Sequence, residues 1–494
     1  MKKYLYFIIP LFVASNSFSH GITNLWMMGY DNGASLPFGG TNIDFSSGTP
    51  NIYHVNRTMN FCTSNGIITN SNGNVLFYTN GVYIANALGD TMLNGDGLNP
   101  GVYTTAYLND GLSITQADLI IPFPGDSMKY YLFHETIDNG IFSAFYFHTS
   151  VIDMTLDNGL GGVVNKNDTI LTDVLVAGFV TGCKHANGRD WWVICHQYNS
   201  NRYFKFLVTP GGISAPYIQN IGKIMVNYGG GQTVFSPDGS KFAIYHAGDD
   251  LDIMDFDRCT GDFSNCVHVA IDDSAYAAGA AFSENSKVLY LSSTNYIYQF
   301  DLTAANIPST KTIVAVWDSF YSPHPPFAST FNLSLLAPDQ KIYVNCGNGT
   351  LDMHVINYPD SLGLACNVCQ HCVHLPTYNA FTIPNFPNYF LGADSTSICD
   401  TLLTLNPALL KEEEIGLKLF PNPTTRVLYA ALPEKFKNKE LKIFNAFGQE
   451  MAVNFSFIKN GEYLEVNTTS LSQGVYFLEL LSDREKVVKI FVKE

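Results

Sequence analysis

Charged residues are scarce in this chain. Asp, Glu, Lys and Arg make up 14% of its 494 residues, aromatic residues make up another 14%, and there are 40 glycines. Helical proteins usually carry far more Lys, Glu and Ala, so this composition favours an all-β protein, in which aromatic side chains fill pleated surfaces and glycines serve the turns. With 27 basic against 43 acidic residues, the net charge of −16 argues against nucleic acid and anionic membranes as partners.

Long hydrophobic runs are also missing, apart from one at the N-terminus. Lys2 and Lys3 precede an apolar run over residues 4–13, and small residues follow up to Ser19. A bilayer requires roughly 20 apolar residues. The pattern therefore predicts a signal peptide over residues 1–19 and no membrane-spanning segment. In the periplasm and beyond it, the ten cysteines are expected to be mostly disulfide-bonded.

The common local catalytic motifs are absent as well. The sequence contains no GxSxG, no HExxH and no phosphate-binding P-loop. We therefore expect a binding protein rather than an enzyme, and no cofactor.

What the chain does contain is a repeated segment, in which a Gly, Asn or Asp turn leads into a short apolar strand. The clearest copy is Phe235–Asp257, with the turn Pro237-Asp238-Gly239; proline presets φ and glycine accepts positive φ. Aligned on one strand position, successive copies are 55, 61, 51, 46 and 54 residues apart. The aligned positions are Val75, Tyr130, Trp191, Phe242, Val288 and Ile342.

Repeats of roughly 40–50 residues with several strands each are typical of β-propeller blades. In the central copy we expect strands at residues 232–236, 241–246, 251–257 and 267–271. One blade cannot bury both of its faces, so the blades must close into a ring. The sequence predicts an all-β fold over residues 20–399, a β-propeller of six or seven blades; an array of β-sandwiches is the alternative.

Two family resemblances support this prediction. FSPDGSKFAIY, at Phe235–Tyr245, resembles the PD40 and WD40-like repeats of secreted bacterial propellers. Residues 24–214 also resemble a recurrent propeller of exported Bacteroidota proteins, through IDFSSGTP, NGNVLFYTNG, YYLFH and DWWVICHQYNSNRYFKFLVTPGGIS. The resemblance implies a secreted or surface-displayed module and no particular ligand.

The composition changes after Cys399. Residues 400–416, with Lys411 and three glutamates, lack strand periodicity and predict a linker. Residues 417–494 return to short alternating strands without the repeated segment. A stretch of about 80 residues of this kind predicts one small antiparallel β-sandwich.

This C-terminal stretch resembles the type A C-terminal sorting domain of the type IX secretion system. The resemblance is carried by LFPNP at Leu419–Pro423, a Gly448-Gln449 turn, LSQGVYFLEL at Leu471–Leu480 and a basic final strand. It implies transport across the outer membrane by the type IX machinery, and removal of the domain by a sortase-like peptidase. The residues expected to carry the sorting signal are Leu419, Phe420, Pro421, Asn422, Pro423, Gly448, Gly474 and Tyr476.

Two cysteine pairs stand close together in the repeats. Cys259 and Cys266 flank an eight-residue segment, and we expect them to clamp the turn between the third and fourth strands of the central blade. Cys183 and Cys195 are candidates to staple a hairpin in the preceding blade. Spacing does not fix the connectivity of ten cysteines.

A third group of cysteines has the spacing of a metal site. Cys366, Cys369 and Cys372 are separated by two residues each, with His371 and His374 among them. Thiolates and imidazoles at such spacing can bind zinc. Disulfides are favoured here because the protein is exported, with Cys399 as a further partner.

Two other groups of residues are candidates for chemistry. Asp249, Asp250, Asp252, Asp255 and Asp257 could hold calcium, although aspartates of propellers also commonly accept hydrogen bonds from turn amides, which we favour. His134, His196 and His246 follow the same strand of three successive copies. We expect them at one end of the ring in structural roles, closed to solvent, rather than in catalysis.

The sequence thus predicts a secreted or outer-membrane surface propeller that binds an unknown extracellular ligand through its loops, in adhesion or in capture of a glycan or protein. A propeller hydrolase or lyase acting at the central channel is the alternative. A metal-bound cluster of carboxylates and histidines at the channel mouth would favour the enzyme, and exposed aromatic residues on the loops would favour binding.

Overall fold

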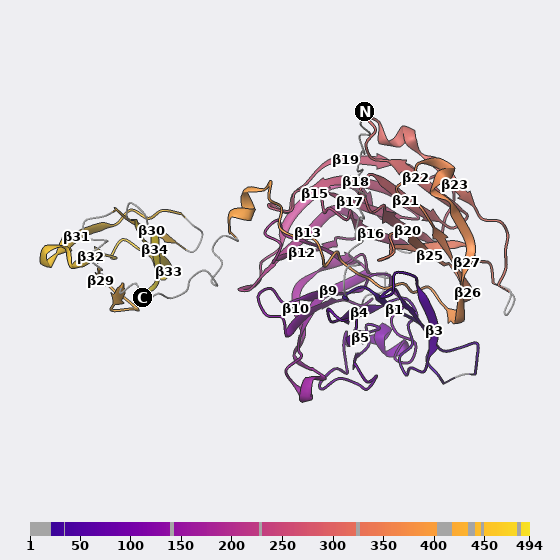
Figure 1. The fold of residues 1–494 in the computed structure, drawn as a ribbon, viewed down its shortest axis with the longest axis horizontal. Helices are drawn as coiled ribbons and strands as arrows, with labels where there is room; N and C mark the ends of the chain where they lie inside the picture. The colour runs from indigo at the N-terminus through magenta and orange to yellow at the C-terminus, as the bar shows by residue number, and fades with distance from the viewer. Residues whose placement is uncertain are drawn as a thin grey trace, which may run out of the picture. The chain divides into compact units, whose positions relative to one another are not determined.

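The computed structural model describes residues 21–33, 35–138, 143–226, 230–322, 327–402, 417–432, 440–445, 449–481 and 486–494 (Figure 1). The expected signal peptide lies outside the described residues, as do residues 403–416 of the expected linker. The chain divides into two compact units, residues 1–402 and 403–494. Among the described residues, no helix is long and apolar enough to cross a membrane.

The described residues of unit 1 form seven antiparallel sheets that follow one another along the chain, and we call them blades 1 to 7. In each sheet successive strands pair as a meander, except that the last strand of the fourth sheet, β15, pairs with β13. Blade 1 contains β1 (Leu25–Gly29), β2 (Gly40–Asp44) and β3 (Asn51–Val55), and blade 2 contains β4 (Gly66–Thr69), β5 (Val75–Thr79) and β6 (Ile84–Asn86). Blade 3 contains β7 (Asp118–Pro122), β8 (Lys129–His134), β9 (Ser143–Asp153) and β10 (Gly162–Val176). A short helix, α1 (Val102–Ala106), stands between blades 2 and 3.

Blades 4 to 7 continue the same order. Blade 4 contains β11 (Thr181–Lys184), β12 (Trp191–His196), β13 (Ser200–Thr209), β14 (Gly212–Ile213) and β15 (Tyr217–Met225), and blade 5 contains β16 (Gly231–Phe235), β17 (Lys241–His246), β18 (Asp250–Phe256) and β19 (Phe263–Val269). Blade 6 contains β20 (Ala278–Phe282), β21 (Val288–Ser293), β22 (Tyr296–Asp301) and β23 (Thr312–Val316). Blade 7 contains β24 (Phe331–Leu336), β25 (Ile342–Cys346), β26 (Thr350–Ile356) and β27 (Val368–Asn379).

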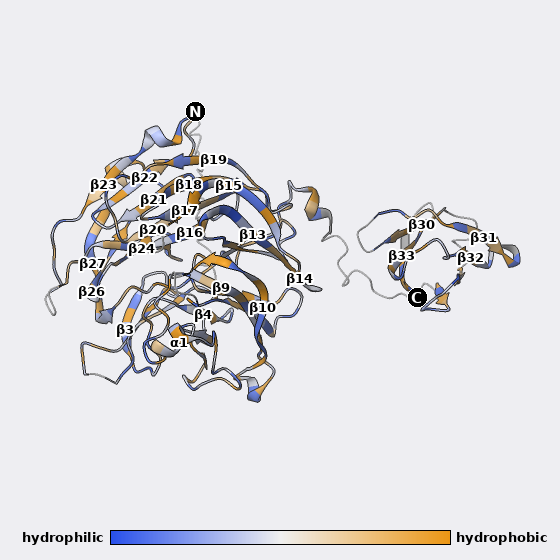
Figure 2. Ribbon diagram, turned by 180° about the vertical axis from the view of Figure 1, so that it is seen from behind, coloured by the Kyte–Doolittle hydropathy of each residue, from blue (hydrophilic) through white to orange (hydrophobic). Residues whose placement is uncertain are grey.

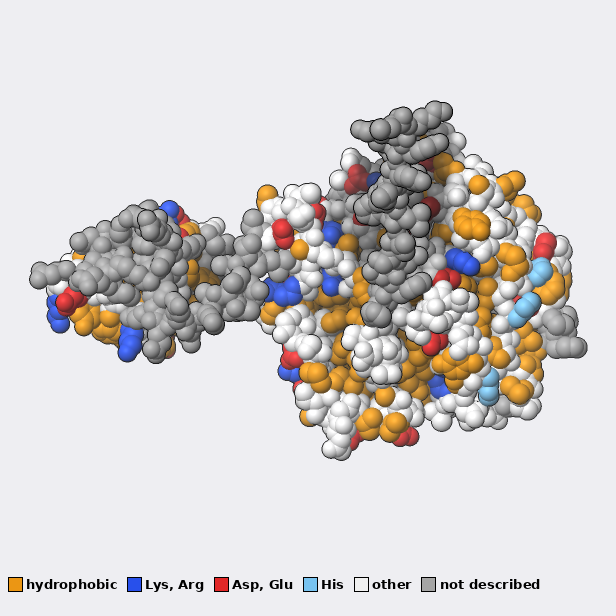
Figure 3. Space-filling view, in the orientation of Figure 1, with side chains coloured by type: hydrophobic (Ala, Val, Ile, Leu, Met, Phe, Trp, Pro, Cys, Tyr) orange, Lys and Arg blue, Asp and Glu red, His pale blue; other side chains and the backbone are white. Residues whose placement is uncertain are grey.

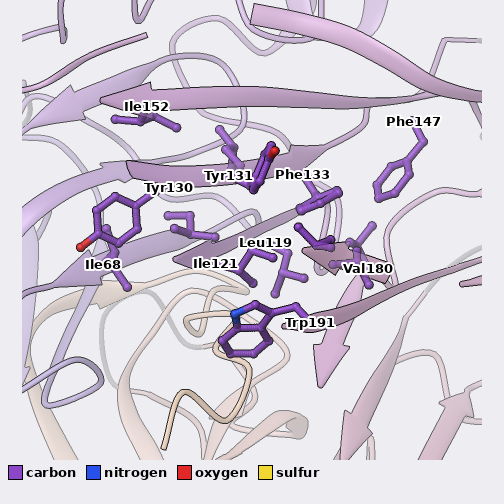
Figure 4. Packing of buried hydrophobic residues seen from close by; sticks show 14 of the residues in the cluster. Ile68, Leu119, Ile121, Tyr130, Tyr131, Phe133, Phe147, Ile152, Val180 and Trp191 are labelled. Carbon is purple, nitrogen blue, oxygen red and sulfur yellow. The ribbon is translucent and has the colours of Figure 1, made fainter. Parts of the chain in front are cut away.

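Hydrophobic clusters between neighbouring sheets join the blades. The largest joins blades 2, 3 and 4 and includes Ile68, Phe133 and Trp191 (Figure 4). Further clusters join blade 1 to 2, 4 to 5, 5 to 6 and 6 to 7. A cluster around Trp26 and Tyr343 joins blade 7 back to blade 1. The blades therefore close into a ring, and unit 1 is a β-propeller with seven blades.

Blade 5 shows how the repeated segment makes a blade. β16 and β17 pair with Phe235 opposite Phe242, across the expected Pro-Asp-Gly turn. In that turn Gly239 has φ 72°, and the Asp238 carboxylate accepts hydrogen bonds from the Ser240 amide (2.9 Å) and the Ser236 hydroxyl (2.6 Å). The predicted outer strand begins four residues early, at Phe263. Along the strands, hydrophobic and hydrophilic residues alternate over short distances (Figure 2).

Unit 2 contains two antiparallel sheets around one core. The first has the order β28 (Lys418–Phe420), β29 (Val427–Ala431), β32 (Tyr463–Asn467) and β31 (Asn454–Ile458), and the second has the order β30 (Glu440–Asn445), β33 (Gly474–Leu481) and β34 (Lys486–Lys493). Leu428 and Leu464 of the first sheet share a hydrophobic cluster with Leu478 and Phe491 of the second. The expected β-sandwich is therefore present.

Phe45 tests whether the contact between blades 7 and 1 holds the ring closed. It is 2% exposed, and its ring lies 5.0 Å from Trp26 and 5.5 Å from Tyr343 of blade 7. We expect Phe45→Ala to lower the free energy of unfolding of the propeller by about 3–5 kcal/mol, the usual cost of truncating a buried phenylalanine. Denaturant unfolding measures it, with Leu88→Ala, at an exposed position, as the control. Equal midpoints for the two variants would contradict the prediction.

Candidate functional site

A cavity of about 870 Å³ lies inside the ring of unit 1. The innermost strands of blades 4 to 7 form its wall, through residues 181–182, 232–235, 280–282 and 334–336. The wall is completed by residues 384–388 and 390–392, which belong to a stretch that we call the closing segment, residues 380–399. The cavity is therefore built from both the blades and the chain that follows the last blade.

Hydrogen bonds to blades 3 and 5, and to the connections that precede blades 2 and 4, hold the closing segment in place. The Asn385 side chain donates to the carbonyls of Asp118 and Val180, and its backbone N–H donates to Asn65. The Tyr389 hydroxyl donates to Ile120 (2.7 Å), and the Asn388 amide donates to Pro237 (2.6 Å). Phe381 donates its N–H to Cys62. At its far end, Cys399 is disulfide-bonded to Cys259 of blade 5.

Two glutamines close gaps between the innermost strands. Gln232 of β16 donates to the Ser334 carbonyl (2.8 Å) and accepts from the N–H groups of Ala280 and Ser334 (3.0 Å each). Gln116, which precedes β7, makes the same kind of paired contact with the backbone of Thr233. Both side chains are buried and both line the cavity. They satisfy backbone groups that the innermost strands, which do not pair between blades, would otherwise leave unbonded.

The cavity wall carries two carboxyl groups, Glu284 and Asp339. Desolvation by burial raises the pKa of both, helped at Glu284 by the charge of Asp360. The Tyr343 hydroxyl donates to Asp339 (2.8 Å). Most of the remaining wall is formed by neutral residues, with amides, hydroxyls and aromatic rings among them.

The three histidines do not line the cavity. His134, His196 and His246 end the second strands of blades 3, 4 and 5 and are all buried, as expected for structural roles. His134 contacts Asn99 (2.7 Å) and Ser150 (2.9 Å), and His246 accepts from the Gly248 N–H (3.2 Å). Neither ring nitrogen of His196, nor Nε2 of His246, has a hydrogen-bond partner among the described residues. The expectation that all three imidazoles would be satisfied is therefore wrong for His196 and met at only one nitrogen of His246.

Burial lowers the pKa of all three imidazoles. It lowers the pKa of His196 to about 4, and that of His134 is lowered well below its ordinary value, with the neighbouring His148 as a further cause. For His246 the Asp249 carboxylate opposes this effect. Neutral imidazoles in separate interblade positions are packing groups, and they do not assemble a catalytic site.

Asp118, at the start of β7, is the most unusual titratable group near the closing segment. It is 1% exposed, and neither carboxyl oxygen has a hydrogen-bond partner in the part of the chain that the structure describes. Burial raises its pKa to about 8. The carboxyl group is therefore held neutral in the folded propeller at neutral pH.

The expected pairs Cys259–Cys266 and Cys183–Cys195 are absent, whereas the disulfide expected within the group Cys366, Cys369 and Cys372 is present between Cys369 and Cys372. Cys259 is bonded to Cys399 and Cys369 to Cys372, while Cys183, Cys195, Cys266 and Cys366 are free, as are Cys62 and Cys346. The expectation that most cysteines would be bonded is therefore wrong for this structure. Zinc is disfavoured at Cys369 and Cys372, because a disulfide sulfur is no thiolate ligand.

Strand geometry explains both missing pairs. Cys183 lies opposite Trp192, so Cys195, three residues further along β12, faces the other side of the sheet. Cys259 lies in the turn after β18, whereas Cys266 is the fourth residue of the extended strand β19. At about 3.3 Å per residue, this places Cys266 roughly 10 Å beyond the turn.

The acidic run of blade 5 is used in contacts within the blade and with blade 4, to which Lys223 belongs. Asp250 contacts Lys223 (2.6 Å), Asp252 contacts His268 (2.8 Å) and Asp255 contacts Lys241 (2.7 Å). Asp257 accepts from the Cys259 N–H in the turn. Among the described residues, no group of three or more His, Cys, Asp and Glu side chains is placed to hold a metal ion.

Exposed aromatic side chains gather on the connections of blades 6, 7 and 1. Tyr276, Tyr321, Phe327, Phe38 and Phe381 are 65%, 53%, 44%, 41% and 40% exposed. We call these five residues the aromatic loop surface.

Neighbour contacts bring several of these connections together. Gly347, in the β25–β26 connection, lies against Ala277, next to Tyr276, and its neighbour Asn348 donates to the Ala328 carbonyl, next to Phe327. Gly349 then lies against the Tyr30 hydroxyl. The Tyr30 and Tyr378 rings both contact the ring of Phe38, at 5.4 and 5.2 Å. None of the five residues was predicted from the sequence, because each stands outside the repeated segment.

The sorting-signal residues lie at two places in unit 2. Leu419 and Phe420 belong to β28, and Asn422 binds the final strand through the Ile490 carbonyl (3.1 Å) and the Val492 N–H (2.8 Å). Gly474 begins β33, and the buried Tyr476 stacks on Phe491 of β34. Pro421 and Pro423 flank Asn422, and Gly448 lies outside the described residues. The first and last parts of the motif therefore meet along β34.

Comparison with known proteins identifies unit 2. Residues 418–494 match the family of secretion system C-terminal sorting domains. The chain is therefore a β-propeller carrying a sorting domain, which marks it for secretion or display at the cell surface. No curated protein matches the chain.

Similar solved structures are remote. They include a 6-phosphogluconolactonase, assigned as putative, from Bacteroides fragilis (11% identity, TM-score 0.44, 74% of this chain and 98% of that one) and the Dos1 propeller (12%, 0.37, 66% and 91%). A protein of unknown function from Bacteroides thetaiotaomicron is 9% identical, with TM-score 0.34, over 90% of each chain. Similarities at this level carry no argument about activity.

Asp118 predicts a pH-dependent cost to stability. The group is protonated in both states below its ordinary pKa of about 3.9, but between about pH 4 and 8 only the unfolded chain releases the proton, so stability falls as pH rises. We expect Asp118→Asn to gain stability over the parent chain across this range, by up to about 1.4 kcal/mol per pH unit, and to keep a constant difference above pH 8. Denaturant unfolding at a series of pH values measures this, and parallel curves would contradict it.

Proposed function

We propose that the propeller is a secreted or surface-displayed binding module that takes up an extracellular glycan or protein on the aromatic loop surface. The observation that carries the proposal is the presence of five exposed aromatic side chains on the connections of three neighbouring blades. Large, rigid aromatic side chains bury much apolar area at little cost in conformational entropy, and they dominate binding energies at interfaces. Loops on a rigid scaffold are the usual place for binding residues.

The charge distribution is consistent with such a ligand. Acidic and basic side chains are scattered singly among neutral and hydrophobic ones on the face of the molecule seen in Figure 3. The net charge of −16 disfavours polyanions. A neutral glycan or a protein surface suits an aromatic platform better.

A second candidate function rests on the cavity. Glu284 and Asp339 both line it, and burial raises the pKa of each, the direction in which the pKa of a general acid is shifted. A hydrolase or lyase acting on a substrate in the cavity would use these two groups. The histidines favoured for catalysis in the sequence-based alternative have no part in it.

We also propose the route of export. The signal peptide over residues 1–19 would deliver the chain to the periplasm, and unit 2 would deliver it to the type IX machinery, as in Bacteroidota. A sortase-like peptidase would then cut within the linker, residues 400–416. The propeller would be released or anchored after this cut.

Binding is tested with two substitutions on the aromatic loop surface. Tyr276→Ala and Tyr321→Ala each remove an exposed ring, and we expect each to weaken binding about tenfold or more, as for an interface residue worth at least about 1.4 kcal/mol. Oligosaccharide and cell-surface protein arrays identify the ligand class, and calorimetry measures affinity. Tyr358→Ala, at an exposed tyrosine outside the surface, should bind as the parent chain does. Equal weakening by all three substitutions would contradict the proposal.

Export is tested by deleting residues 417–494. Because unit 2 has its own hydrophobic core, the remaining propeller should fold and stay in the periplasm. Fractionation with immunoblotting locates it, and circular dichroism of the purified truncation checks its fold. Folded, truncated protein outside the cell at the parent level would disprove the proposed route.

A further inference from the structure

Blade 7 carries a disulfide on its outer strand, beside a small pocket. Cys369 and Cys372 are bonded in β27, three residues apart. Cys372 is exposed and Cys369 is half-buried. The pocket, of about 320 Å³, is lined by both cysteines, His374 and Lys341, and by apolar residues that include Ile52 and Val355. One of the two sulfur-bearing residues is therefore open to an incoming molecule, and the pocket beside it has the size of a small ligand.

The disulfide spans a bulge in the sheet. Val355 of β26 pairs with Cys369, and Met353 pairs with Val373. Three residues of β27, from Gln370 to Cys372, therefore stand opposite His354 alone. Such bulges often re-aim side chains at functional sites.

Contacts to the preceding blade hold the bulge independently of the disulfide. Gln370 donates to the Val316 carbonyl (2.8 Å) and accepts from the Asp318 N–H (3.2 Å). His371 contacts the Asp318 carboxylate (2.9 Å), and its ring stacks on Phe320 at 4.0 Å. When the disulfide is open, these contacts keep the two thiols near one another, ready to close again.

An oriented imidazole lines the same pocket as the two cysteines. The Nδ1–H of His374 donates to the buried Asp352 carboxylate (2.7 Å), so Nε2 carries the lone pair. His374 is two residues beyond Cys372 and therefore on the same face of the strand. The Lys341 ammonium on the same pocket favours thiolates, which are the reactive form in disulfide exchange.

We propose that Cys369 and Cys372 form a thiol–disulfide exchange site for low-molecular-weight thiols. His374 Nε2 takes the proton of the incoming thiol, and the thiolate attacks Cys372 Sγ. The Cys369–Cys372 bond breaks, and Cys369 leaves as a thiolate that recovers the proton from His374. A second thiol molecule attacks the bound one, so that a small disulfide leaves and Cys372 becomes a thiol.

This sequence balances in atoms and electrons. Two thiol molecules lose two protons and two electrons as their disulfide forms, and the cysteine pair gains both. The reverse reaction, with a small disulfide as the oxidant, restores Cys369–Cys372. The exchange uses neither the aromatic loop surface nor the cavity, so it is independent of the proposed binding function.

Blade 5 repeats part of this site without the disulfide. Cys266-Val267-His268 corresponds to Cys372-Val373-His374, and His268 contacts Asp252 at 2.8 Å. Three residues before Cys266 stands Phe263, where blade 7 has Cys369, and Cys266 is free. The Asp–His pair is therefore shared by two blades, and the disulfide beside it distinguishes blade 7.

The test follows the reaction of the full-length chain with reduced glutathione under anaerobic conditions. Samples are quenched with an alkylating agent and their peptides are analysed by mass spectrometry. We expect Cys369–Cys372 to open at least tenfold faster than Cys259–Cys399, and glutathione to be found on Cys372. Opening of Cys259–Cys399 at an equal or higher rate, or glutathione mainly on Cys369, would overturn the proposal.

The role of His374 is tested with His374→Ala and His374→Gln. Each should slow the opening by roughly tenfold at pH 7, where the base has a proton to remove. The difference should vanish at pH 10, because a thiol with a pKa of about 8.5 is already ionised there. In the control variant His268→Ala, which removes the matching histidine of blade 5, the Cys369–Cys372 disulfide should open at the same rate as in the parent chain. Equal slowing by His374→Ala at both pH values, or none at pH 7, would overturn the assignment of a base.

Discussion

The structure depends on one constraint: each blade has two faces, and neither can be left to water. A blade is too thin to have a core of its own, so its side chains become buried only against the two neighbouring blades. In an open row of seven sheets the outer face of the first and of the last would stay exposed. Closure through Trp26, Phe45 and Tyr343 removes both faces at once. All seven blades are therefore interdependent, and the chain after the last blade is tied back to blade 5 by Cys399.

Closure creates a second problem, at the centre of the ring. The innermost strands of different blades approach one another without pairing, and their backbone groups require partners. Gln116 and Gln232 supply those partners with neutral amides, and Asn385 of the closing segment does the same for blades 3 and 4. Neutral groups suit the task because a buried charge is costly to desolvate. Asp118 is an exception, and burial holds it neutral. This preference for neutral groups agrees with the low content of charged residues in the whole chain, 14%.

Most of the fold could be predicted because turn chemistry is local. Pro237, Asp238 and Gly239 specify a turn through their own conformational preferences, and the Gly, Asn or Asp turns of the other copies do the same. The second strands of six blades were therefore located correctly from the sequence. Blade 1 has no copy of the repeated segment, because residues 30–39 rather than a short turn lead into its second strand β2, so the sequence left six or seven blades open. The cysteine partners could not be predicted, because Cys259 and Cys399 are 140 residues apart and only ring closure brings them together. The aromatic loop surface was missed for the same reason: its residues come from three blades that are neighbours only in the closed ring.

The repeat also shows how one framework can support different chemistry. Blades 5 and 7 share an aspartate on the third strand that orients a histidine on the fourth, with a cysteine two residues before it. In blade 5 the cysteine is half-buried, and burial raises its pKa to about 11, with the Asp252 charge contributing, so its thiol is inert at neutral pH. In blade 7 a wider bulge turns the corresponding Cys372 to the surface and brings Cys369 within bonding distance. The Asp–His pair is the same in both blades. The local course of the outer strand therefore decides whether the cysteine beside it is half-buried as a free thiol, as in blade 5, or exposed in a disulfide, as in blade 7.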